Sequence, residues 1–75
     1  MKKARIVVRE DVIGTDMKEC SDMKLQLFNG IYYSPFEIFD DHMHSVEVCE
    51  LLMEKYKKEY RHLHIESVEL QFAKV

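Results

Sequence analysis

The chain has 75 residues, which is enough for one small domain spanning residues 1–75 and too few for a second. Hydrophobic residues make up 47% of the chain and charged residues 33%, values typical of a folded protein and not of a disordered tail. No apolar run approaches the ~20 residues that a membrane span requires, and the N-terminal residues lack the apolar segment of a secretory signal. We therefore expect a soluble protein of the cytoplasm.

The two cysteines, Cys20 and Cys49, lie far apart in the sequence and form no CxxC pair. Thiols in a cytoplasmic chain usually stay reduced, so we expect no disulfide. We predict that Cys49 is a small apolar residue on a helix and that Cys20 is an incidental residue of a loop.

The first element is a strand. Residues 4–9 alternate between aliphatic side chains at even positions and mainly basic side chains at odd positions, which is the pattern of a strand with one face turned inward. Residues 10–23 show no period and contain Gly14, Thr15, Asp16, Ser21 and Asp22, all of them turn residues. We therefore predict a long loop here.

A β-hairpin follows around Asn29-Gly30. Asn-Gly tolerates the positive φ that both central positions of a type I′ turn require. This turn predicts that Phe28 pairs with Ile31, Leu27 with Tyr32, and Gln26 with Tyr33. One face of the hairpin then carries Leu25, Leu27 and Tyr32, and the other carries Phe28, Ile31 and Tyr33; the sequence leaves open which is buried.

The segment Ser34-Pro35-Phe36-Glu37 has two interpretations. It could be a capping box that opens a helix at Pro35. Alternatively, Phe36 and Ile38 continue the strand alternation, Pro35 sits on a sheet edge, and the helix begins after Asp40 or Asp41. We favour the second, because a helix from Pro35 to Leu63 would far exceed the mean length of about 11 to 12 residues.

One amphipathic helix and a last strand complete the chain. The helix should bury apolar residues at three- and four-residue spacing, and residues 68–72 alternate again as a strand. The phase of this strand differs from that of Leu63 and Ile65, which predicts a bulge or an offset start near Glu66-Ser67. The fold class is therefore α+β: a small antiparallel or mixed β-sheet, in the order β, β-hairpin, α, β, covered by one amphipathic helix. The residues expected in the buried helical stripe are Met43, Val46, Cys49, Leu52, Met53, Tyr56, Tyr60 and Leu63.

Little in the sequence points to chemistry. His42-Met43-His44 and His62-Leu63-His64 flank the helix and would stand about 24 Å apart, too far for a shared metal site. A local site formed by Asp40, Asp41, His42 and His44, with Cys49 as a further candidate ligand, stays open. The chain has no Gly-rich phosphate loop and no recognisable nucleophile motif. We expect no catalysis, no cofactor and no resident metal.

Charge is the most informative feature. The net charge is −3, but residues 10–54 contain eleven acidic residues and two lysines, a local charge of −9, while both flanks are basic. Such a field attracts a partner of opposite sign and repels nucleic acid. We predict one acidic surface that binds a basic protein, formed by Asp16, Glu19, Asp22, Glu37, Asp40, Asp41, Glu47, Glu50 and Glu54.

With its Asn29-Gly30 hairpin, acidic helix start and final strand, the chain resembles the small acidic bacteriophage proteins that inhibit host machinery, including DNA mimics that block nucleoid proteins of the HU type. The resemblance implies a non-enzymatic host-takeover inhibitor in the bacterial cytoplasm. Such a protein acts by stoichiometric occlusion of a DNA-binding or transcription protein. It contacts neither nucleic acid nor membrane directly.

An alternative interpretation uses the basic flanks. Lys2, Lys3, Arg5, Arg9 and the Lys55–Arg61 cluster could bind nucleic acid directly, with Tyr33 or Phe28 stacking on bases. The last strand could also pair across a homodimer through an exposed edge.

Overall fold

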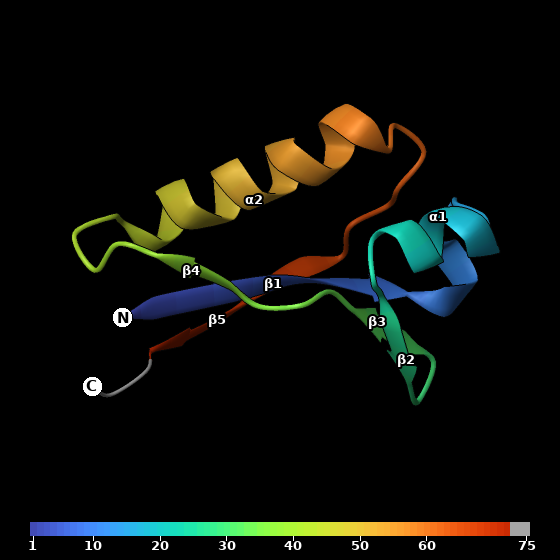
Figure 1. The fold of residues 1–75 in the computed structure, drawn as a ribbon, viewed down its shortest axis with the longest axis horizontal. Helices are drawn as coiled ribbons and strands as arrows, with labels where there is room; N and C mark the ends of the chain where they lie inside the picture. Colours follow the sequence, from blue (N-terminus) through green and yellow to red (C-terminus); the bar gives the residue numbers. More distant parts are fainter. Residues whose placement is uncertain (73–75) are drawn as a thin grey trace.

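The computed structural model describes residues 1–72 and shows a five-stranded antiparallel sheet with one long helix lying along it (Figure 1). The predicted α+β class is confirmed. In chain order the elements are β1 (Lys2–Arg9), η1 (Glu10–Val12, a short 3-10 helix), α1 (Met17–Asp22), β2 (Gln26–Phe28), β3 (Ile31–Tyr33), β4 (Glu37–Phe39), α2 (Ser45–Glu59) and β5 (Ser67–Phe72).

Strand β1 is the centre of the sheet. β5 pairs with it from Lys2 to Val7, β4 pairs with Lys2 to Ala4, and β3 pairs with Val7 to Arg9. β5 pairs with the residues of β1 that β4 also pairs with, and with Val7, which β3 also pairs with. A strand has only two edges, so β3 and β4 must both lie on the edge of β1 opposite β5. β3 and β4 therefore act as one interrupted strand, with β2 outside β3.

Ser34 bridges the interruption between β3 and β4. Its backbone N–H donates to the Ile6 carbonyl at 3.2 Å, and its hydroxyl accepts the Ile6 N–H at 2.9 Å. Pro35, which has no N–H, follows immediately, and the chain resumes pairing at Glu37. The favoured interpretation of this segment is confirmed, since the strand continues and the helix begins only at Ser45.

The core lies between α2 and the even-numbered side of β1. Ala4, Ile6 and Val8 are fully buried there, and Val48 and Leu52 contribute the buried residues of α2. Val46 was predicted to be buried but is 69% exposed, because Val48 and Leu52 occupy the inward positions. Leu63 is buried as predicted but reaches the core from beyond the end of α2. The remaining buried apolar residues are Cys20, Met23, Tyr32 and Ile65.

The prediction of a loop over residues 10–23 was wrong. The segment contains η1 and α1, and the Asp16 carboxylate caps α1 by accepting the Glu19 N–H at 2.8 Å. A helix of six residues is too short to show a period, so only its capping residue could have indicated it. Cys20 is therefore a core residue and not an incidental loop residue, and burial raises the pKa of its thiol.

The hairpin and the last strand agree with the sequence. Phe28 pairs with Ile31, and both Asn29 and Gly30 have positive φ, at 50° and 76°. Tyr32 is the buried residue of the hairpin, so the face that carries Tyr32 is turned to the core. The phase change before β5 is also present: the Val7 carbonyl accepts the Glu66 N–H although the paired residue of Val7 is Ser67.

The Ser34 hydroxyl generates a first prediction. Ser34→Ala leaves the buried Ile6 N–H without an acceptor and should lower the free energy of unfolding by about 1 to 3 kcal/mol in urea titrations. Ser67→Ala is the matched control, because Ser67 is exposed and should change stability far less. Equal stability of the two variants would contradict this role of Ser34.

The two glycines generate a second prediction, since both have positive φ but different surroundings. A Cβ on Gly14 would lie 2.1 Å from the His62 carbonyl oxygen, whereas a Cβ on Gly30 would meet nothing within 4 Å. Gly30→Ala should lower the free energy of unfolding by about 1 kcal/mol, because alanine disfavours the positive φ of this position. Gly14→Ala should lower the free energy of unfolding by about 1 to 3 kcal/mol more, because the segment that contains His62 must move to make room. Urea titrations of both variants measure the difference.

Candidate protein-binding surface

The nine predicted acidic residues fall into two groups. Three lie at α1, beside the C-terminal half of α2, where Asp22 lines a hollow together with Tyr56 and Tyr60. Six lie on β4, on the turn that follows it, and along α2. Figure 1 shows α1 and the turn before α2 at opposite ends of the molecule. The first group is Asp16, Glu19 and Asp22; the second is Glu37, Asp40, Asp41, Glu47, Glu50 and Glu54.

The second group borders an exposed apolar side chain. Leu51 of α2 is 46% exposed and, with Leu52 and Phe39, lines a shallow groove of about 300 Å³ between α2 and β4. Ile38 of β4 is paired with Lys3, so its exposed side chain lies on the face of the sheet away from α2. We call this groove and its six acidic neighbours the α2–β4 surface.

Helical spacing places three carboxylates beside the groove. Glu47, Glu50 and Glu54 follow one another at three- and four-residue intervals, so they share one exposed side of α2. Leu51 lies four residues after Glu47 and three before Glu54, which puts its side chain between theirs. An apolar anchor is therefore flanked by negative charge.

The carboxylates of the α2–β4 surface differ in their internal partners. Glu37 forms an ion pair with Lys55, and Asp41 lies 2.7 Å from the N-terminal amino group, whose hydrogen bond lowers the pKa of Asp41. Asp40 accepts the His42 N–H at 2.8 Å. Over residues 1–72, Glu47, Glu50 and Glu54 join no ion pair, and Glu54 does not meet Lys58. These three carboxylates are available to a cation from outside.

Lys3, Arg5 and Arg9 of β1 lie on the opposite face of the sheet from α2, and all three are engaged. The Arg5 guanidinium lies 4.3 Å from the ring centroids of both Tyr33 and Phe36, and its Nε donates to Glu69 at 2.6 Å. Lys3 lies 4.8 Å from the centroid of Phe36. These contacts fill the face that the single helix leaves uncovered.

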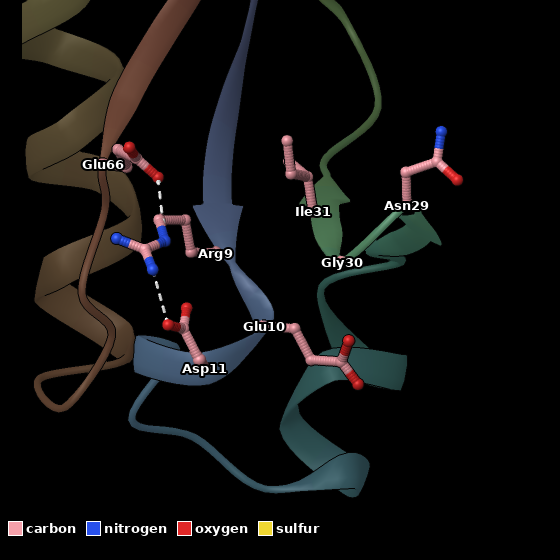
Figure 2. Close-up of a pocket in the computed structure, with 7 residues that line it drawn as sticks. All are labelled: Arg9, Glu10, Asp11, Asn29, Gly30, Ile31 and Glu66. Carbon is pink, nitrogen blue, oxygen red and sulfur yellow. Dashed lines mark hydrogen bonds and ion pairs between the residues drawn. The ribbon is translucent and has the colours of Figure 1, made fainter.

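Arg9 is also neutralised. It lines an open hollow of about 650 Å³ at the end of β1, beside the Asn29-Gly30 turn (Figure 2). Its guanidinium lies 2.6 Å from Asp11 and 4.0 Å from Glu66. Figure 2 shows it between these two carboxylates, while Glu10 points away. An anion entering this hollow would meet a cation that two carboxylates already share.

Comparison of the chain with protein-family models, curated proteins and solved structures found no match. Within residues 1–72, no group of three or more His, Cys, Asp or Glu side chains is placed to hold a metal ion. The same part of the chain contains no helix long and apolar enough to cross a membrane.

The sequence missed the apolar part of the α2–β4 surface. The available signal was Leu51, which is adjacent to the buried Leu52 and off the stripe of three- and four-residue spacing. Phe39 gave no such signal, because a strand alternation does not show which face a helix covers.

The Arg5–Glu69 pair generates a prediction about pH. The Arg5 hydrogen bond lowers the pKa of Glu69 in the folded protein. A depressed pKa gives stability that is complete above the unfolded-state value, about 4.3, and is lost as the pH falls through the folded-state value. Arg5→Gln should therefore raise the Glu69 midpoint measured by NMR titration, and the stability difference from wild type should shrink below about pH 4. An unchanged midpoint would contradict the pairing.

Proposed function

We propose that this protein is a non-enzymatic protein-binding inhibitor whose α2–β4 surface occupies a basic, nucleic-acid-binding surface of a host DNA-binding or transcription protein. The observation that carries the proposal is the row Glu47, Glu50 and Glu54, which joins no ion pair within residues 1–72 and flanks the exposed Leu51.

The features of this surface favour a partner whose binding surface is apolar at its centre and basic around it. Unpaired carboxylates on an exposed helix face steer a cationic partner and set its orientation, while a buried apolar anchor supplies affinity. The groove lined by Leu51, Leu52 and Phe39 would receive an apolar side chain of the partner. A surface of Lys and Arg that normally contacts phosphates would meet carboxylates at the rim.

The resemblance to acidic bacteriophage inhibitors names a partner class that can be tested. A nucleoid protein of the HU type exposes the kind of basic surface that the proposal requires. Binding there would exclude DNA by simple occupancy, so inhibition should be stoichiometric and should weaken as salt screens the charges.

The test is a competition experiment with a purified HU-type protein and a fluorescent DNA duplex, read by anisotropy. Wild-type protein should displace the duplex, and the triple variant Glu47→Lys, Glu50→Lys, Glu54→Lys should displace it on the order of tenfold or more weakly. The matched control is Glu10→Lys, Asp22→Lys, Glu59→Lys, which makes the same charge change at exposed positions of the opposite end. Equal loss in both triple variants would reject the α2–β4 surface.

If the HU-type protein does not respond, the same variants identify another basic partner by affinity capture from a nuclease-treated bacterial lysate. Capture of one basic protein that survives nuclease, is lost at high salt and is lost in the α2 triple variant alone would support the proposal. Capture that depends on nucleic acid would reject it.

A second candidate is single-stranded nucleic-acid binding on the open face of the sheet. The observation that favours it is the stacking of Arg5 on Tyr33 and Phe36, since bases stack on the same groups. A labelled single-stranded oligonucleotide at low salt tests it. Binding that Tyr33→Leu weakens and that the α2 triple variant strengthens would favour this candidate over the acidic surface.

A further inference from the structure

Strand β5 has a long unpaired edge. Over the described residues it pairs with β1 alone, so alternate residues, Val68, Leu70 and Phe72, present their backbone N–H and C=O groups on the other side. The other outer strands, β2 and β4, have three residues each. Short edges are poor templates for a further strand, whereas a continuous edge of this length is a good one.

The usual protection of such an edge is missing. Residues 67–72 contain no proline and no lysine, and the irregularity at Glu66-Ser67 precedes the regular pairing. The one charged residue of β5, Glu69, is bound by Arg5 of the neighbouring strand and so is drawn toward β1. The edge is nearly neutral.

The sequence of β5 is complementary to itself in one register. Identical antiparallel strands are related by a two-fold axis, so facing residues come from the same side of the sheet and one residue faces its own copy. Centring on Glu69 would place two carboxylates opposite each other. Centring on Leu70 places Leu70 opposite Leu70, Glu69 opposite Gln71, and Val68 opposite Phe72.

The Leu70-centred register also uses exposed apolar area. Val68 and Leu70 are only half-buried in the single chain, and Phe72 is 68% exposed. On the open face, the Gln71 amide already donates to Glu69 of its own chain at 3.0 Å. The same amide from a second chain would face a carboxylate that can accept it.

We propose that two copies of this chain associate through antiparallel β5–β5 pairing centred on Leu70, forming one continuous sheet. β4 and β5 lie on opposite edges of β1, so the dimer leaves both α2–β4 surfaces uncovered. A dimer would present this surface twice. The inference does not rest on the proposed function and is tested on the protein alone.

The test is sedimentation equilibrium of the full chain at neutral pH with substitutions at Gln71, which is exposed. Gln71→Lys places a cation opposite Glu69 of the second chain at two symmetric positions and should tighten the dimer in a salt-sensitive way. Gln71→Glu places like charges there and should weaken the dimer about tenfold. In the Glu69-centred register, position 71 would face Ser67, and the two variants would not diverge.

Matched controls are Gln26→Lys and Gln26→Glu, which make the same changes on exposed β2 and should leave the dimer constant unchanged. Circular dichroism of each variant at low concentration checks that the single chain is folded. A wild-type protein that stays monomeric up to about 1 mM would overturn the inference. So would a dimer that responds alike to Gln71→Lys and Gln71→Glu, or to the Gln26 controls.

Discussion

The pairing of β1 on both of its edges is the interaction on which the rest of this structure depends. β5 covers one edge without a break, and the other edge is shared by β3 and β4, with Ser34 supplying a hydroxyl where the ladder is interrupted. A chain of 75 residues provides one long helix for this sheet. Only the even-numbered side of β1 can therefore be buried beneath α2, and the other side has to be stabilised differently.

That second face explains the distribution of charge. Arg5 stacks on Tyr33 and Phe36 and pairs with Glu69, and Arg9 is shared by Asp11 and Glu66. These cations stabilise the open face. Because they already pair with carboxylates there, they do not neutralise the carboxylates of α2. Glu47, Glu50 and Glu54 of α2 have no such role within residues 1–72, so these carboxylates remain available to a cation from outside.

The parts of this fold that could be predicted from sequence are those with a strong local signal. Asn29-Gly30 determined the hairpin register, and the alternation of residues 68–72 identified β5. α1 could not be predicted because its six residues are held by Asp16 and by tertiary burial of Cys20 and not by a period. The acidic residues fall into two groups because of where the tertiary fold places α1 relative to β4 and α2. No local sequence pattern indicates this placement.

The two edges of β1 differ in the kind of contact they can offer. On the β4 side, Pro35 and the break at Ser34 limit regular backbone pairing to three residues at a time, so a partner there must bind through side chains in the groove of Phe39 and Leu51. On the β5 side the backbone is continuous and its one charge is neutralised, so a partner there can bind through the backbone itself. Side-chain recognition selects a foreign surface, whereas backbone pairing with self-complementary side chains selects a second copy. The interrupted edge thus suits binding through side chains, and the continuous edge suits binding through the backbone.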